Sequence, residues 1–188
     1  INILSASRVF LFGARDIWFV VGVPIFFYDK LSWSFTEVGS FMASWIIFYG
    51  IIQSLAPKLL KIFYGNNFSE NEQAFIWAIK LLLIIACLGI LSYTYDYNGY
   101  LICMGLFLFG FIFAINSSIH SYLILALAKK NDVTLDVGFY YMANAIGRLL
   151  GCIISGFSYQ IAGLIGCFIF AGIFLFFCSI FSFYLKSY

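Results

Sequence analysis

The chain has little charge and almost no proline. Only 10% of its 188 residues are charged, whereas 64% are hydrophobic and 22% are aromatic. Soluble domains carry about 25% charged residues, and disordered chains combine low hydrophobicity with high charge, so both classes are excluded. The formal net charge of +2 is too small to indicate a nucleic-acid partner. With only two prolines, the composition fits long apolar helices and indicates an integral membrane protein whose main partner is the lipid bilayer.

Sequence patterns for catalysis or metal binding are also missing. The five cysteines lie in apolar stretches and form no C-x-x-C pair, so they predict neither a disulfide framework nor a zinc site. No phosphate loop, carboxylate dyad or nucleophile–base pair is visible, so we expect no enzyme activity, no catalytic residue, no metal and no cofactor. Ile1 is not a start methionine, and no signal peptide precedes the first apolar run. We therefore interpret the chain as a fragment that begins just before a span.

Continuously apolar segments, without the alternation of a β-barrel, predict an all-α membrane protein with six transmembrane helices. The expected spans cover residues 7–28, 36–56, 73–94, 99–128, 137–159 and 161–185. The second and fifth segments share a faint pattern, because Glu37-Val-Gly resembles Asp136-Val-Gly and each is followed by Met-Ala. Two inverted three-helix repeats would produce such a relation, and chance similarity of two apolar helices is the alternative.

Basic residues in the loops predict the orientation of the chain. Lys30 lies in the loops of one side, and the other side holds Arg8, Lys58, Lys61, Lys129, Lys130 and Lys186. The side richer in Lys and Arg faces the cytoplasm, so both ends of the chain are expected there. Lys80 lies about one turn inside the third span, and its stem can reach the inner interface.

Two arginines remain for the membrane interior, Arg15 and Arg148, each near the middle of its span. A mid-bilayer arginine costs at least about 2.5–3.5 kcal/mol, so such residues face a cavity or a partner. Arg15 and Asp16 are neighbours that point about 100° apart, and we expect them to pair poorly. A guanidinium fork suits carboxylate, phosphate or arsenate oxygens. The pattern predicts an oxyanion site at the midplane; the alternative is an ion pair, such as Asp16 with Arg148, that only joins helices.

The fifth segment carries a polar face and a face of small residues. Tyr141, Asn144 and Arg148 are spaced three and four residues apart, so they share one face. Small residues recur every four positions on another face and predict close packing against a neighbouring helix; they are Ala143, Gly147, Gly151 and Ser155. The polar face is thereby predicted to turn toward a cavity.

The fourth segment carries Asn116 and His120, four residues apart on one face. His120 is the only histidine, and its ordinary pKa of about 6.5 suits proton coupling. Asp16 is the second candidate for that role. The alternative for His120 is a hydrogen-bonded histidine near the cytoplasmic interface.

The two arginine-bearing stretches resemble one family. Residues 7–24 read S-R-V-F-L-F-G-A-R-D-I-W-F-V-V-G-V-P, and residues 137–160 include V-G-F-Y-Y-M-A-N-A-I-G-R-L-L-G. They resemble the seventh and eleventh helices of organoarsenical efflux permeases of the ArsJ type, members of the major facilitator superfamily. The resemblance covers essentially all 188 residues and implies the C-terminal six-helix half of a twelve-helix carrier, with the N-terminal half as its partner.

Related organophosphate carriers place an arginine midway along the seventh helix, and Arg15 matches that position. The loop Ala56-Pro-Lys-Leu-Leu-Lys61 does not clearly keep the acidic and basic loop motif of the superfamily. That departure leaves the gating contacts open.

The resemblance implies secondary active efflux of 1-arseno-3-phosphoglycerate by an antiporter, giving arsenate resistance, in the cytoplasmic membrane of a bacterium. A glyceraldehyde-3-phosphate dehydrogenase would supply this small anionic substrate. Arg15 and Arg148 would bind its oxyanions, and Asp16 would tune them. Hydrogen bonds would come from Tyr141, Asn144 and Asn116. Two alternatives remain: another organic-anion or sugar-phosphate carrier of the superfamily, and a non-transport six-helix membrane protein.

Overall fold

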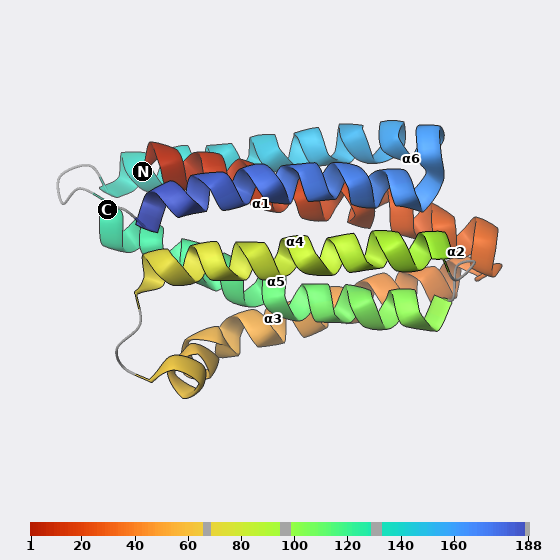
Figure 1. Cartoon of the computed structure of the whole chain (residues 1–188), viewed down its shortest axis with the longest axis horizontal. Coiled ribbons are helices and arrows are strands. Elements are labelled where there is room, and N and C mark those ends of the chain that lie inside the picture. Colours follow the sequence, from red (N-terminus) through yellow and green to blue (C-terminus); the bar gives the residue numbers. More distant parts are fainter. Residues whose placement is uncertain (66–68, 95–98, 129–132, 187–188) are drawn as a thin grey trace.

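The computed structural model describes the chain except for residues 66–68, 95–98, 129–132 and 187–188. Its described residues form helices joined by short connections, with no strand among them (Figure 1). Long helices follow from the continuous apolar sequence, because in a membrane a helix satisfies its backbone hydrogen bonds within the segment. Lys129 and Lys130, which contribute to the orientation prediction, lie outside the described residues.

The first span consists of three helical pieces in direct succession. They are α1 (Asn2–Ile17), a π-helical turn η1 (Trp18–Gly22) and α2 (Val23–Leu31). Pro24 at the start of α2 lacks an amide proton, and its ring displaces the carbonyl four residues earlier. A π-helical turn accommodates this disturbance, because its hydrogen bonds reach one residue further along the chain.

Three more helices follow: α3 (Phe35–Tyr64), α4 (Glu70–Thr94) and α5 (Gly99–Leu127). Ser34 fixes the start of α3 through a capping box. The Ser34 hydroxyl accepts a hydrogen bond from the Glu37 amide at 3.3 Å, and the Ser34 amide donates to the Glu37 carboxylate at 2.8 Å. Two orphan amides at the helix start are thereby satisfied.

The last helical element, α6 (Val133–Lys186), contains the fifth and sixth predicted spans. Its 54 residues far exceed the roughly 20 residues of one crossing. The backbone leaves the helical region at Ala162 (φ −143°, ψ 22°) and Gly163 (φ 60°, ψ −149°), where a glycine adopts the positive φ without the strain of a Cβ. There α6 turns back along the bundle (Figure 1). We call residues 133–161 its first limb and residues 164–186 its second limb.

Five described helices are long and apolar enough to cross a membrane, not the six predicted. The difference arises because α6 is one of the five and carries two apolar stretches. A single glycine-centred break separates them, with no loop between.

Helix α1 packs against both limbs of α6. A Cβ on Gly147 of the first limb would overlap the carbonyl oxygen of Val9, so the two backbones are in direct contact. The stripe of small residues therefore has the packing role predicted for it. On the second limb, the hydroxyl oxygens of Ser7 and Ser182 lie 2.8 Å apart, which brings the start of α1 and the end of α6 to the same end of the bundle.

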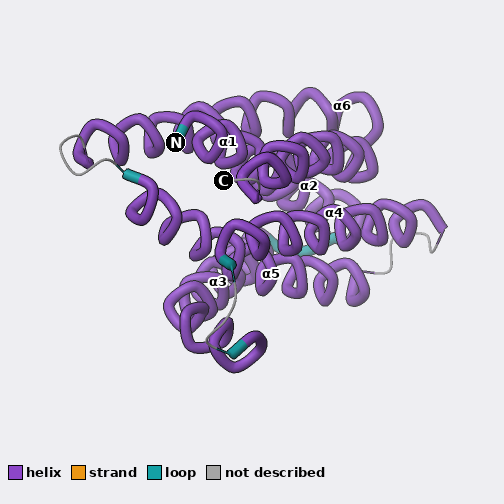
Figure 2. Tube along the Cα trace, turned by 60° about the vertical axis from the view of Figure 1, so that its left-hand side comes forward, coloured by secondary structure: helices purple, strands orange, loops and turns teal. Residues whose placement is uncertain are grey.

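An aromatic cluster joins the first span to α3 and α5. Trp18 lies edge-to-face against Trp45 of α3 and Phe109 of α5, with ring centroids 5.6 Å and 5.2 Å apart. The Trp45 indole also donates to the carbonyl of Leu106 at 2.8 Å. α3 nevertheless lies at one edge of the bundle, opposite α6 (Figures 1 and 2).

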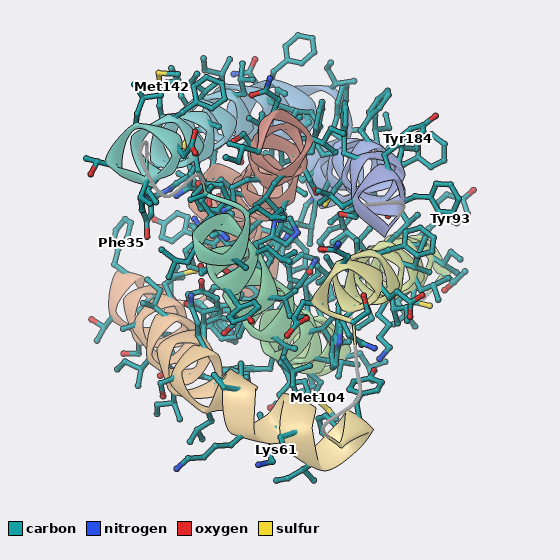
Figure 3. The ribbon with its side chains drawn as sticks, turned by 90° about the vertical axis from the view of Figure 1, so that its left-hand side faces the viewer. Phe35, Lys61, Tyr93, Met104, Met142 and Tyr184 are labelled. Atoms are coloured by element: carbon teal, nitrogen blue, oxygen red, sulfur yellow. The ribbon has the colours of Figure 1, made fainter. Side chains whose placement is uncertain are left out.

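Large apolar side chains cover the outside of the bundle. Phe35, Tyr93, Met142 and Tyr184 point outward around its rim (Figure 3), and each is more than half exposed. Such a surface needs lipid or another protein around it, because a soluble monomer rarely exposes contiguous apolar patches. The fold is therefore that of a multi-pass membrane protein.

Candidate functional site

The carboxylate of Asp16 is held between two arginines. Its Oδ1 accepts a hydrogen bond from Nε of Arg15 at 2.6 Å, and its Oδ2 accepts one from Nε of Arg148 at 3.2 Å. Arg15 and Asp16 are in the last turn of α1, whereas Arg148 comes from the first limb of α6. The structure thus brings together the three charged residues predicted for the membrane interior.

The prediction that Arg15 and Asp16 would pair poorly is wrong. The arginine stem is long and flexible, so its guanidinium folds back across the helix surface to the neighbouring carboxylate. The interhelical pair of Asp16 with Arg148, named as the alternative, forms as well. Asp16 is therefore the shared partner of both arginines.

Burial differs strongly across this cluster. Asp16 is 1% exposed and Arg15 is 11% exposed, whereas Arg148 is 57% exposed. The rings of Phe12, Phe19 and Phe113 surround the Arg15 guanidinium, with centroids 5.0, 6.0 and 5.5 Å from its central carbon. The cluster thus has a buried apolar side and an open side, and Arg148 marks the open side.

Tyr141 and Asn144 lie on the same limb as Arg148 but further toward its start. Tyr141 is more than half exposed and contacts the ring of Tyr140. Seven residues, or about 10 Å of helix, separate it from Arg148. Asn144 is half-buried, and its side-chain oxygen has no hydrogen-bond partner among the described residues. Both side chains therefore lie at a different level from Asp16.

Arg8 does not lie in a loop at the membrane surface, as its use in the orientation count required. It is 4% exposed, and its Nη1 donates to the carbonyl and hydroxyl oxygens of Ser117 in α5 at 3.3 Å and 3.2 Å. Its central carbon lies 3.9 Å from the centroid of the Phe12 ring and 5.0 Å from that of Tyr140. The cause is the early start of α1 at Asn2, which places Arg8 in the second helical turn.

A spacing in the sequence could have revealed Arg8. It precedes Arg15 by seven residues, which is nearly two helical turns, so both arginines project from one face of α1. Phe12 lies on the same face, between them. A hydropathy count assigns an arginine at the edge of an apolar segment to the flanking loop. Only its helical phase, which is its position around the helix axis, indicates that the side chain turns inward.

Asn116 and His120 lie deep inside the bundle. Both are 0% exposed. The nitrogen and the oxygen of the Asn116 side-chain amide have no hydrogen-bond partner in the described part of the chain. The two ring nitrogens of His120 have none there either. The interpretation of His120 as a hydrogen-bonded interfacial residue is therefore wrong. Between them, Ser117 accepts hydrogen bonds from Arg8 and Tyr49.

Comparison with known families identifies the fold around these residues. The model of the Major Facilitator Superfamily matches residues 4–187, nearly the whole chain. The chain belongs to the Major Facilitator Superfamily. It is accordingly a multi-pass membrane transporter, a class whose members are generally not enzymes. No curated protein and no solved structure matches it at a significant level.

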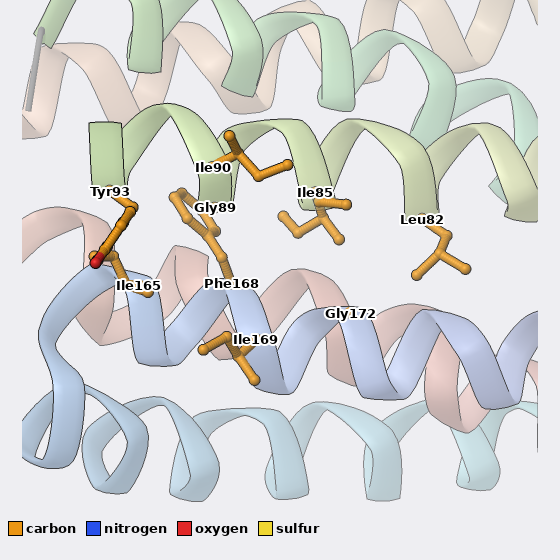
Figure 4. A pocket seen from close by; sticks show the side chains of 10 residues that line it. Leu82, Ile85, Gly89, Ile90, Tyr93, Ile165, Phe168, Ile169 and Gly172 are labelled. Carbon is orange, nitrogen blue, oxygen red and sulfur yellow. The ribbon is translucent and has the colours of Figure 1, made fainter. Parts of the chain in front are cut away.

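The transporter also has an apolar groove away from its charged clusters. Side chains of α4 and the second limb of α6 line a cavity of about 400 Å³, among them Leu82, Ile85, Phe168 and Ile169 (Figure 4). Tyr93 adds a hydroxyl at one end of the groove. No charged side chain is among the described residues that line it, so this lining does not favour an anionic substrate.

Within the described part of this superfamily member, no group of three or more His, Cys, Asp or Glu side chains could hold a metal ion. The five cysteines are free thiols. The chemistry available to the site therefore comes from guanidinium, carboxylate, amide and imidazole groups on α1, α5 and the first limb of α6.

Proposed function

We propose that this transporter carries a phosphate-like organic anion and that its substrate is 1-arseno-3-phosphoglycerate, exported as an antiporter to give arsenate resistance. The observation that carries the proposal is the excess of positive charge inside the bundle. Arg8, Arg15 and Arg148 lie on two helices that pack together, and Asp16 is the acidic partner in the ion pairs of the described residues. Three guanidinium charges face this one carboxylate, so a net charge of +2 (3 − 1) remains among these residues, which suits a doubly anionic solute.

In the absence of substrate, Asp16 would occupy the guanidinium donors that the substrate uses. A carboxylate and a phosphate or arsenate oxygen accept the same fork of N–H donors, so the solute competes with Asp16 for Arg15 and Arg148. While the solute is absent, Asp16 keeps two interior guanidinium groups paired. The exchange of one oxyanion for the other would couple binding to movement of α1 against α6, and protonation of Asp16 or His120 is the proposed coupling step.

A second helical bundle would cover the open side of the cluster. Arg148 is 57% exposed, and an arginine facing lipid at mid-membrane costs at least about 2.5–3.5 kcal/mol. Only 11% of the most apolar stretch of α3 is buried. These two surfaces support a carrier in which a partner half, the N-terminal six helices implied by the resemblance, closes the site. Rocking of the two halves would then give alternating access.

The proposed location is the cytoplasmic membrane of a bacterium, with both ends in the cytoplasm. The start of α1 and the end of α6 lie at the same end of the bundle, which supports this arrangement. Without Arg8, the remaining lysines of the orientation count still favour the same side.

Arsenate resistance tests the proposal. Cells would express the full-length protein together with a glyceraldehyde-3-phosphate dehydrogenase, as wild type, Arg15→Gln, Arg148→Gln or the control Lys80→Gln. Lys80 is a half-buried cation on α4 that donates to Tyr64 and lies over the ring of Trp77. The control substitution therefore removes one positive charge outside the arginine cluster. We expect both arginine variants to lose protection and the control to keep it.

Two results would contradict parts of this proposal. If both arginine variants protect as well as wild type at equal amounts in the membrane, the arginines only join helices. If wild type protects equally without the dehydrogenase, the organoarsenical is not the substrate. Transport of other sugar phosphates into membrane vesicles would then identify the second candidate, another organic-anion carrier of the superfamily.

A further inference from the structure

Two arginines of α1 flank one aromatic ring. The central carbons of Arg8 and Arg15 lie 3.9 Å and 5.0 Å from the centroid of the Phe12 ring, so they are within about 9 Å of each other. Arg15 pairs with Asp16. The described ion pairs, both of them to Asp16, leave Arg8 without a carboxylate partner.

Unpartnered polar atoms gather on α5, where Arg8 meets it. Arg8 donates to Ser117, the residue directly after Asn116, and His120 follows one turn later. The amide of Asn116, both ring nitrogens of His120 and Nε of Arg8 have no hydrogen-bond partner within the described residues. Buried polar groups of native proteins are nearly always hydrogen-bonded, so each exception calls for an explanation, of which a functional role is one.

We propose that Arg8, Asn116 and His120 form a second oxyanion site, which receives the far anionic group of a solute whose first group lies on Arg15 and Arg148. This inference rests on the proposed transport of an organic anion. It assigns the two anionic ends of such a solute to two different sets of residues.

The groups present match the chemistry of such an end group. The Arg8 Nε–H, the Asn116 amide N–H and a protonated nitrogen of His120 are donors to phosphate, arsenate or carboxylate oxygens. The amide oxygen of Asn116 is an acceptor for a hydroxyl on the solute backbone. The buried location strengthens each of these interactions, because it excludes water.

A purely structural role for Arg8 is the competing explanation. Its hydrogen bonds to Ser117 and its place over Phe12 would brace α1 against α5. Such bracing explains the position of Arg8 but not Asn116 and His120, whose side-chain polar atoms have no hydrogen-bond partner among the described residues. Asn116 therefore separates the two explanations better than Arg8 does.

Ligand-induced shifts of the thermal unfolding midpoint test the second site. The full-length protein in lipid nanodiscs would be titrated with 3-phosphoglycerate, which has an anionic group at each end, and with inorganic phosphate, which has one. Chloride at equal ionic strength controls for screening. A ligand that binds only the folded protein raises its stability according to its affinity, so the shifts yield the ratio of the two dissociation constants.

In wild type, 3-phosphoglycerate should bind at least about tenfold more tightly than phosphate, the effect of one additional charge-assisted hydrogen bond. Arg8→Gln and Asn116→Leu should lose this preference but keep the affinity for phosphate. Arg15→Gln should weaken both ligands, and Lys80→Gln should change neither. Asn116→Leu keeps the test decisive if Arg8→Gln does not fold, because its side chain has no described protein partner to lose.

Two different failures are distinguishable. If Asn116→Leu and Arg8→Gln keep the preference for 3-phosphoglycerate, the second site is wrong and the proposed anion transport stands. If wild type binds neither anion above the chloride control, the proposed function fails, and the second site fails with it.

Discussion

Replacing Asp16 with asparagine would remove the charge on which the arginine cluster depends and would keep the shape of the side chain. The Asp16 carboxylate is 1% exposed and accepts hydrogen bonds from Arg15 at 2.6 Å and Arg148 at 3.2 Å. The asparagine oxygen can still accept one of these bonds. The variant therefore isolates the contribution of the negative charge.

The expected loss of stability is about 3 kcal/mol. Removing one partner of a buried ion pair costs about 3–5 kcal/mol, because the other charge stays buried and unpaired. Arg15, at 11% exposure, carries most of this cost. Arg148 is 57% exposed, and an exposed pair contributes about 1 kcal/mol at most. The hydrogen bond that asparagine retains moves the total toward the lower end of the range.

Added phosphate should restore much of this loss in Asp16→Asn. With the carboxylate gone, both guanidinium forks are open to an oxyanion, and a ligand at 100 times its dissociation constant adds about 2.7 kcal/mol. Wild type should gain less, since Asp16 competes for the same donors. The measurement is the thermal unfolding midpoint with phosphate or chloride at equal ionic strength.

Asp29→Asn is the matched control, since Asp29 is an exposed carboxylate of α2 in the same span. It should show neither the loss nor the phosphate effect. The reasoning is refuted if phosphate stabilises Asp16→Asn no more than chloride does, because the arginines would then not accept an oxyanion in place of the carboxylate.

Further substitutions test the packing and the unpartnered polar groups, each through the unfolding free energy. Gly151→Ala should destabilise by about 1–3 kcal/mol, because its Cβ would lie 2.7 Å from an α1 carbonyl oxygen, whereas Gly156→Ala, with open space around it, should gain up to about 1 kcal/mol. Asn116→Leu should stabilise by about 1–3 kcal/mol while transport falls; unchanged transport would contradict a binding role. Ser155→Ala should cost about 1–3 kcal/mol, since its hydroxyl accepts two amide protons of the first span, and a neutral result would show that the π-helical turn does not need them.

Hydropathy predicts the helices of this chain well but not their ends. Hydropathy predicts the first span over residues 7–28, whereas the helical pieces run from Asn2 to Leu31. Hydropathy reports the thickness of the apolar layer, while helix ends depend on local groups. Ser34 illustrates this: its capping box with Glu37 starts α3 within a residue of the expected 36. Where no such signal exists, a helix continues past the apolar stretch.

The break within α6 was only partly predictable. The expected spans ended at residue 159 and restarted at 161, near the non-helical pair Ala162 and Gly163. The sequence has no polar loop at this point, so the turn within α6 depends on backbone geometry alone. A glycine at positive φ supplies that geometry, but many other glycines of the chain are helical, and a single sequence does not distinguish them.

The charges of the interior show most clearly why helical phase must be combined with hydropathy. Counting by distance from the end of an apolar segment assigned Arg8 to the cytoplasmic surface, yet it is 4% exposed and contacts α5. Its seven-residue spacing from Arg15 places both arginines on one face of α1. An arginine on a buried face needs hydrogen-bond acceptors inside the protein, whatever its distance from the helix end. Arg15 pairs with Asp16 beside it, whereas the contacts of Arg8 in the described part of the chain are to Ser117 and to two aromatic rings. Arg8 thus has no carboxylate partner among the described residues, and the proposed second oxyanion site is the role that would use its charge.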